Sequence, residues 1–254
     1  MNIMPRLTQQ VEADPEAIAR AADRDGVVQV RHDGMNPQDF VDLMRGLGPL
    51  MFTEGETPAD EAPDLNVVTN VGRTTKPKSV FHSDTTYVAR PPSYSGLIAV
   101  EVPQEGGATL FHDQYAAYDA LPATMKTLLD GATVLHSVTG VTVGPDSETE
   151  ARHPVVRRHP GTGRAALYFT TPARCSELTL NTGETRDDLI QWLYDFSLTL
   201  APPKAHAWSQ GDVVIWDNRC TLHAADHSRV VGNRTLYRGM VRGEVPVAAH
   251  GPDA

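Results

Sequence analysis

The chain has little positive charge, little cysteine and no long apolar run, and each shortage excludes a class of protein. It carries 22 Lys and Arg residues against 32 Asp and Glu residues, a formal net charge of −10. This balance argues against a nucleic-acid partner, because such binding depends on clustered cations that neutralise phosphates. Two cysteines cannot build a disulfide framework. The longest apolar stretch, near residues 96–100, is far shorter than a membrane-spanning helix requires.

The beginning of the sequence also lacks the charged-then-apolar pattern of a secretory signal. We therefore expect a cytoplasmic protein that binds neither nucleic acid nor membranes. Hydrophobic residues make up 40% of the chain and charged residues 21%, as in ordinary folded proteins. The sequence shows no repeat, linker or low-complexity tract, so we expect residues 1–254 to form a single domain.

The pattern along the chain predicts a β-rich fold with helices packed on it. Caps and spaced apolar residues indicate helices at 15–22, 36–47, 115–129 and 186–198. The acidic segment 53–64 is rich in turn-forming residues, which predicts a mobile loop that could serve as a lid. Short β-branched and aromatic segments, separated by Gly, Pro or Asp, favour a sandwich or barrel. These predicted strands include SVFHSDTTYV, SYSGLIAVEV, DVVIWDN and RTLYRGMVRGEV.

One predicted strand contains the pattern His82-Ser83-Asp84. Side chains two apart on a strand point to the same face, so an imidazole and a carboxylate would project together. With ten histidines in the chain the pattern alone is weak, and a polar strand end is the simpler explanation. His223, which follows an apolar strand, could complete a set of two imidazoles and one carboxylate. Such a set suits non-heme Fe(II), because it leaves adjacent coordination positions open.

Arg234 and Arg238 lie four residues apart in a β-rich stretch, in phase with Leu236 and Met240. A buried guanidinium without an anionic partner is costly, so an anion should meet each of them. The partner could be a carboxylate of this acidic chain. Alternatively, an arginine clamp could hold a dicarboxylic cosubstrate through paired hydrogen bonds.

The sequence resembles a known family, the TauD/TfdA group of Fe(II)- and 2-oxoglutarate-dependent dioxygenases. The resemblance covers most of the chain. Its four blocks are FHSDTTYVARPPSYSGLIAVEVPQEGGATLF, DQYAAYDALP, RHPVVRRHPGTGRAALYF and WDNRCTLHAADHSRVVGNRTLYRGMVRGEVP.

The resemblance implies a mainly β fold with flanking helices around a double-stranded β-helix, or jelly-roll. It implies that His82, Asp84 and His223 are the iron ligands. It further implies that Thr109 and Arg234 hold the far carboxylate of 2-oxoglutarate, and that O2 is consumed. By the same likeness, Arg238 faces either the cosubstrate or an anionic group of the primary substrate.

The family chemistry couples decarboxylation of 2-oxoglutarate to oxidation, most simply hydroxylation, of a small anionic substrate, with release of succinate and CO2. In members that act on taurine, a histidine follows the turn after the second helix, whereas an ungapped reading places Thr53 there. This difference argues against taurine as the substrate.

Several alternatives stay open at this stage. The same cofactor chemistry could desaturate, cyclise or oxidatively decarboxylate the substrate. The chain could also be a jelly-roll module that binds a metal or ligand without turnover, and a zinc hydrolase is a poorer alternative because no base accompanies the ligand set. Members of the family are often dimers or tetramers, which leaves a homo-oligomer possible.

Overall fold

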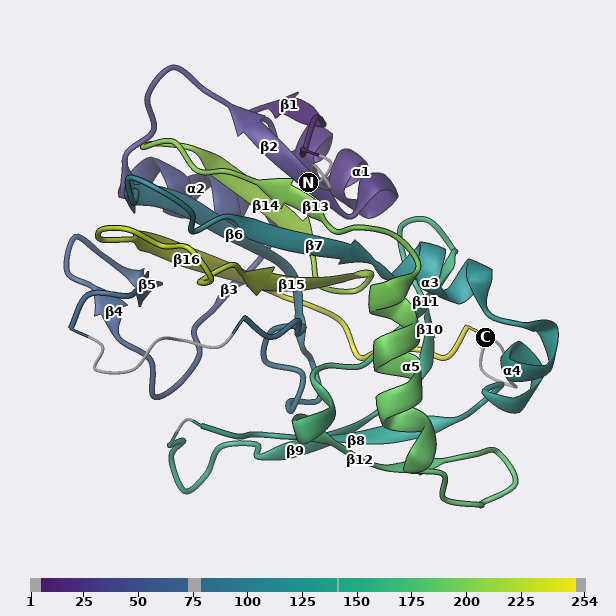
Figure 1. Cartoon of the computed structure of the whole chain (residues 1–254). Coiled ribbons are helices and arrows are strands. Elements are labelled where there is room, and N and C mark those ends of the chain that lie inside the picture. Colours follow the sequence, from purple (N-terminus) through teal and green to yellow (C-terminus); the bar gives the residue numbers. More distant parts are fainter. Residues whose placement is uncertain (1–5, 73–78, 141, 250–254) are drawn as a thin grey trace.

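The structure is a computed structural model of the chain, and it describes residues 6–72, 79–140 and 142–249. Its largest element is a twisted sheet in the strand order β1-β2-β14-β6-β16-β5-β4, with β3 paired to β16 (Figure 1). All of its pairs are antiparallel except β1 with β2. The strands are β1 Gln10–Glu12, β2 Val27–Arg31, β3 Leu50–Met51, β4 Pro58–Ala59, β5 Ala62–Thr69, β6 Pro92–Glu101, β14 Val213–Asp217 and β16 Thr235–Arg242.

A smaller antiparallel sheet, in the order β13-β7-β15, contributes the strand that carries His223. Two further small sheets have the orders β12-β8-β9 and β10-β11. These strands are β7 Thr109–Asp113, β8 Thr133–Ser137, β9 Glu150–Pro154, β10 Val156–Arg158, β11 Ala165–Leu167, β12 Cys175–Thr179, β13 Lys204–His206 and β15 Thr221–Ala225.

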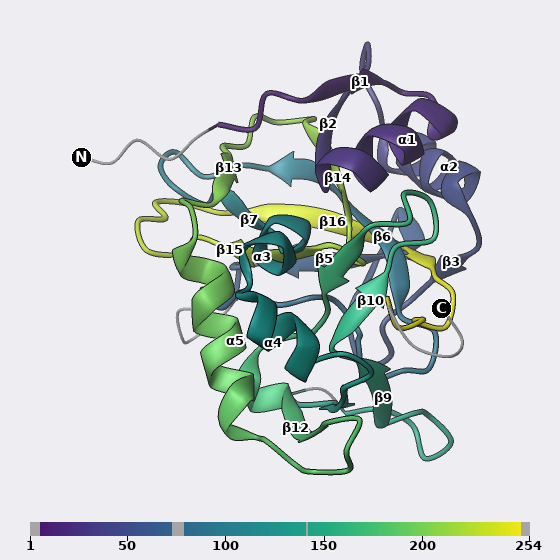
Figure 2. The ribbon, with the colours of Figure 1, turned by 90° about the vertical axis from the view of Figure 1, so that its right-hand side faces the viewer.

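The helices cover the sheets from outside, as Figures 1 and 2 show. Helices α1 and α2 pack on the outer face of the large sheet, where their side chains join one apolar cluster with those of β2, β6 and β14. Helix α5 packs against β12. The helices are α1 Pro15–Asp25, α2 Pro37–Leu47, α3 Gln114–Ala120, α4 Ala123–Leu128 and α5 Asp188–Thr199, with a short 3-10 turn at Pro172–Arg174.

Strand alternation separates two faces of the large sheet. On β16, Val241 and Tyr237 belong to the cluster beneath α1 and α2. Leu236 instead joins Phe111 of β7 and Trp216 of β14 in a second cluster between the large and the small sheet. Residues in phase with Leu236 therefore face the interior between the two sheets. The predicted mainly β fold with flanking helices is confirmed.

Three predicted elements were wrong in detail. Residues 58–64 of the predicted loop form the hairpin of β4 and β5, and only 53–57 are irregular. The predicted helix 115–129 is two short helices, because Pro122 has no N–H to donate and Leu121 adopts an extended conformation before it. The predicted strand around His82 continues as a turn after Ser83.

Among the described residues, no helix combines the length and the hydropathy that crossing a bilayer requires.

Candidate metal centre

Backbone pairing brings His82 and His223 together. The two residues form an antiparallel bridge, in which the backbone N–H of each donates to the backbone C=O of the other at 2.9 Å. Directly opposed residues of such a pair project their side chains on the same side. The two imidazole rings accordingly lie with their centroids 4.3 Å apart. The segment before the turn thus acts as an additional edge on β15.

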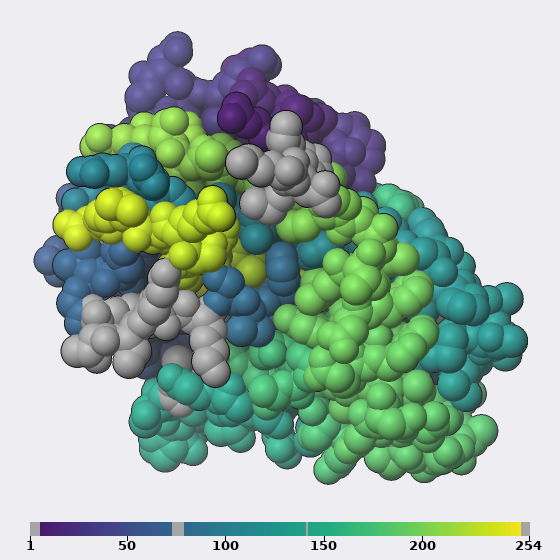
Figure 3. Space-filling model, in the orientation of Figure 1, coloured from purple at the N-terminus to yellow at the C-terminus, as the bar shows by residue number. Residues whose placement is uncertain are grey.

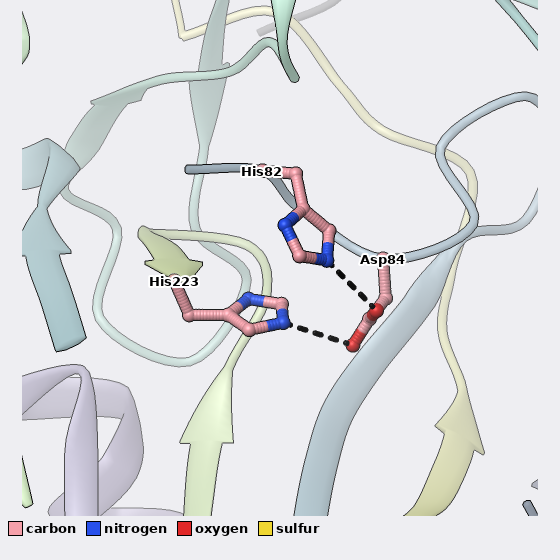
Figure 4. A group of neighbouring side chains, drawn as sticks. All are labelled: His82, Asp84 and His223. Carbon is pink, nitrogen blue, oxygen red and sulfur yellow. Dashed lines mark ion pairs between the residues drawn. The ribbon is translucent and has the colours of Figure 1, made fainter. Parts of the chain in front are cut away.

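Asp84 reaches the same point from the turn that begins after Ser83. Thr85, the next residue, has a φ of 43°, an uncommon conformation for a residue other than glycine. One carboxylate oxygen of Asp84 lies 3.7 Å from Nε2 of His82 and the other lies 3.6 Å from Nε2 of His223. Figure 4 shows both rings pointing at the carboxylate. The three potential ligand atoms all lie within 4.8 Å of one another.

A buried chain of hydrogen bonds fixes the carboxylate of Asp84. Ser95 on β6 donates its hydroxyl to Asp84 Oδ2 at 2.7 Å. Asn218, just after β14, donates its amide to Ser95 Oγ at 2.7 Å and accepts at its oxygen from the indole N–H of Trp216 at 3.1 Å. The large sheet therefore holds the acid group that the turn presents.

The electrostatics of the three groups favour the forms that bind a metal. Burial lowers the pKa of His223 to about 3, so its imidazole is neutral at physiological pH. Burial likewise lowers the pKa of His82, whose Nδ1 lies 3.0 Å from the Val80 carbonyl. That contact assigns the proton to Nδ1 and leaves the lone pair of Nε2 directed at Asp84. Although burial alone would raise the pKa of Asp84, Arg238 and the two imidazoles hold it well below its usual range.

The site offers two neutral imidazole nitrogens and one carboxylate oxygen that converge. This donor set is typical of a metal centre with three protein ligands and open coordination positions. The geometry fits a divalent transition metal, because the ligand atoms already converge and the second nitrogen of His82 is bonded to a backbone carbonyl.

The guanidinium of Arg234 is buried between Gly107 and Thr109. Its Nε donates to the Gly107 carbonyl at 2.9 Å and its Nη2 to Thr109 Oγ1 at 3.3 Å. Thr109 Oγ1 also accepts from the indole N–H of Trp208 at 3.0 Å. No carboxylate among residues 6–72, 79–140 and 142–249 forms an ion pair with Arg234, and burial lowers its pKa to about 10. A buried cation of this kind is suited to an anionic ligand.

Arg238 has a different environment. Its Nη1 donates to Asp84 Oδ1 at 2.8 Å, and its Nη2 donates to Glu56 at 2.6 Å and lies 3.4 Å from Thr53 Oγ1. Thr53 is buried and shares a hydrogen bond with Thr85 at 3.1 Å. We expected an anion beside each arginine. Among the described residues, Arg238 has such a partner and Arg234 does not.

Sequence reasoning missed Glu56, Ser95 and Asn218. Asn218 directly follows an apolar strand that leads into the candidate site, and this was a usable signal. Ser95 lies within an otherwise apolar strand, and a lone polar residue there could also have been noticed. Glu56 gave no signal of its own, because it lies in the acidic segment that was predicted to be a mobile loop.

Comparison with known proteins shows the family of this chain. The family described as "Taurine catabolism dioxygenase TauD, TfdA family" matches residues 5–240. The alpha-ketoglutarate-dependent 2,4-dichlorophenoxyacetate dioxygenase of Cupriavidus pinatubonensis is 29% identical over 248 residues, covering 87% of this chain and 86% of that protein. A Schizosaccharomyces pombe protein, provisionally named as an alpha-ketoglutarate-dependent sulfonate dioxygenase, is 34% identical over 176 residues, which are 65% of this chain and 44% of that protein.

A solved structure shows the same fold. The crystal structure of a taurine dioxygenase from Burkholderia xenovorans matches with a TM-score of 0.78 and 27% identity, covering 99% of this chain and 93% of that chain. The chain belongs to the TauD/TfdA family of alpha-ketoglutarate-dependent, that is 2-oxoglutarate-dependent, dioxygenases. The predicted family, the jelly-roll fold and the dependence on a metal and 2-oxoglutarate are thereby confirmed.

Proposed function

We propose that this protein is an Fe(II)- and 2-oxoglutarate-dependent dioxygenase that hydroxylates a small organic anion and releases succinate and CO2. The observation that carries the proposal is the convergence of His82, Asp84 and His223 within 4.8 Å. In this assignment the three side chains hold the iron. When bound, the metal and 2-oxoglutarate supply the oxidation of a C–H bond by O2, and the chain supplies orientation and a water-poor surrounding.

In the same assignment, Arg234 and Thr109 hold the distal carboxylate of 2-oxoglutarate. The support is the buried guanidinium, which has hydrogen bonds to neutral oxygens and no acidic partner in the described part of the chain. A carboxylate would supply the missing negative charge, with Thr109 Oγ1 beside it. Arg234 thereby fixes the position and the direction of the cosubstrate at one end.

Arg238 is assigned to an anionic group of the primary substrate. It reaches Asp84 directly, so a group bound there lies beside the metal centre. The names of the relatives point the same way, since a sulfonate and 2,4-dichlorophenoxyacetate both carry a negative charge. A cavity of about 190 Å³ adjoins this place and is lined in part by Thr85 and Tyr87. Its volume suits a small molecule or one part of a larger one.

Succinate release tests the metal centre. With ferrous iron, ascorbate and air, the protein should convert 2-oxoglutarate to succinate slowly alone and faster when a screen of small carboxylates, sulfonates and phosphonates supplies the substrate. His82→Ala and Asp84→Ala should lose this activity while keeping a folded circular-dichroism spectrum. His227→Ala, a change close to His223 in sequence but outside the triad, serves as the control. Undiminished turnover in either triad variant would exclude the assignment.

Arg234→Gln tests the cosubstrate clamp. One charge-assisted hydrogen-bonded pair contributes roughly 1.5–3 kcal/mol, so the variant should raise the apparent KM for 2-oxoglutarate by about ten to a hundred times. Arg20→Gln, which removes a charge from the exposed face of α1, should leave that KM unchanged. An unaltered KM in the Arg234 variant would place the clamp elsewhere.

Product analysis distinguishes hydroxylation from the other oxidative outcomes. Hydroxylation adds one oxygen atom to the substrate, whereas desaturation or cyclisation removes two hydrogens. Mass spectrometry of the product of a substrate found in the screen separates these results directly.

A further inference from the structure

The carboxylate of Glu56 rests on the guanidinium that faces the metal centre. It accepts from Arg238 Nη2 at 2.6 Å, while Asp84 accepts from Nη1 at 2.8 Å. Both side chains are largely enclosed, with 11% of Arg238 and 29% of Glu56 exposed. One positive charge therefore has two carboxylate partners before any substrate arrives.

Each terminal nitrogen of Arg238 already donates a hydrogen bond to a carboxylate. Nη1 is bonded to Asp84, and Nη2 is bonded to Glu56 and lies close to Thr53. The remaining Nε is buried and has no hydrogen-bond partner within the described residues. An anionic substrate that is to accept the hydrogen bond of Nη2 must therefore replace the carboxylate of Glu56.

Glu56 is the carboxylate that can be replaced. Asp84 is 3% exposed and is held by Ser95 as well as by Arg238. Glu56 lies on the irregular segment 53–57, where its N–H makes a turn hydrogen bond of 3.3 Å to Thr53. Burial raises the pKa of Tyr87, and the negative charge of Glu56 raises it further. Tyr87 lines the adjoining cavity, so the charge of Glu56 acts on a side chain of that cavity.

We propose that Glu56 determines specificity by occupying the place of the substrate's anionic group, and that a singly charged substrate anion displaces it from Arg238. This inference rests on the proposed function. The exchange replaces one negative charge with another, so the net charge around Arg238 is the same with and without substrate. A neutral molecule cannot displace Glu56, because its hydrogen bond to the guanidinium is weaker than the charge-assisted hydrogen bond of the carboxylate.

A small anion and its neutral analogue test the displacement. Methanesulfonate is titrated into the protein loaded with Mn(II) and 2-oxoglutarate, and the relaxation of its methyl protons by the nearby Mn(II) reports binding beside the metal. Glu56→Gln should tighten methanesulfonate binding at least tenfold. Dimethyl sulfone, which replaces the charged oxygen by a methyl group, should bind equally to both proteins.

Glu61→Gln is the matched control, because Glu61 belongs to the same acidic segment but lies beside Tyr237 on the outer side of β16. It should leave methanesulfonate binding unchanged. Unchanged or weaker binding in Glu56→Gln, or equal tightening in Glu61→Gln, would overturn the inference.

The same samples separate this inference from the proposed function. Water-proton relaxation reports Mn(II) binding, which Asp84→Ala should abolish. If Mn(II) binds in this way and Glu56→Gln does not change the anion affinity, only the inference fails. If Asp84→Ala leaves Mn(II) binding intact, the metal assignment fails and the inference falls with it.

Discussion

Gly107 leaves room for Arg234 at the proposed cosubstrate site. Its φ is 75°, and a Cβ at this position would lie 3.1 Å from Arg234 Cδ and 2.9 Å from a carbon of Pro103. The side chain of Arg234 can therefore pass close to the backbone and bond the Gly107 carbonyl. Sequence analysis predicted the arginine and Thr109 through the family resemblance. It could not predict this close approach, because only folding brings residue 107 against residue 234.

Gly107→Ala should therefore impair both stability and cosubstrate use. The left-handed backbone costs an alanine roughly 1 kcal/mol, and the contact with Arg234 adds displacement of the guanidinium. Gly163→Ala is a matched control, because Gly163 has a φ of 70° and a Cβ added there would meet no atom within 4 Å. We expect both variants to lower the melting temperature and only Gly107→Ala to raise the KM for 2-oxoglutarate. Equal KM values would show that the contact is tolerated.

At the scale of elements, the site is made by pairing between distant segments. The capped helices near residues 15 and 37 were predicted closely, since their signals are local. The bridge between His82 and His223 carries no local signal. The pattern around His82 suggested a strand with two side chains on one face, but the structure gives a bridge followed by a turn. The same residues converge, although for a different physical reason.

Ser95→Ala tests how far strand β6 supports the metal centre. The variant removes the hydrogen bond of 2.7 Å to Asp84 and leaves the amide of Asn218 without its acceptor. Loss of such a supporting contact lowers metal affinity about 10- to 100-fold in comparable centres. Ser93→Ala is the control on the same strand, because its hydroxyl donates to the Val241 carbonyl instead. Mn(II) titration measures both, and equal affinities would assign Ser95 a packing role only.

At the scale of the whole molecule, the early and late parts of the chain meet across the site. In Figure 3 the yellow carboxy-terminal part lies against the blue part that contains β4 and β5, on the same face as helix α5. The class of fold could be predicted from composition and from the spacing of turn-forming residues. Strand order could not, because five of the seven strand pairs in the large sheet join segments far apart in sequence. That residues 1–254 form one domain remains a prediction, and a homo-oligomer remains one of the possibilities that the sequence leaves open.

Buried histidines make the stability of the whole molecule depend on pH. His136 is fully buried against Tyr168, neither ring nitrogen has a hydrogen-bond partner in the described residues, and burial lowers its pKa to about 3. The unfolded chain binds a proton at this residue near pH 6.5, whereas the folded chain does not. The stabilisation is therefore complete above about pH 6.5 and is lost as the pH falls.

His136→Phe should reduce this dependence. Between pH 7 and pH 5 the substitution should reduce the loss of unfolding free energy by about 2 kcal/mol. Urea unfolding at pH 7 and pH 5 measures the difference for both proteins. If the two proteins lose the same free energy on acidification, other groups account for the dependence.

The pairing of His82 with His223 also sets an order of events during synthesis. A ribosome exposes His82 and Asp84 long before it exposes His223 and, later still, Arg234. The nascent chain therefore carries an incomplete set of ligands and unpaired strand edges until β15 and β16 have emerged, which is the stage at which partly folded chains aggregate. With the proposed ligand set, all three side chains are available to a metal only after residue 223 has been translated.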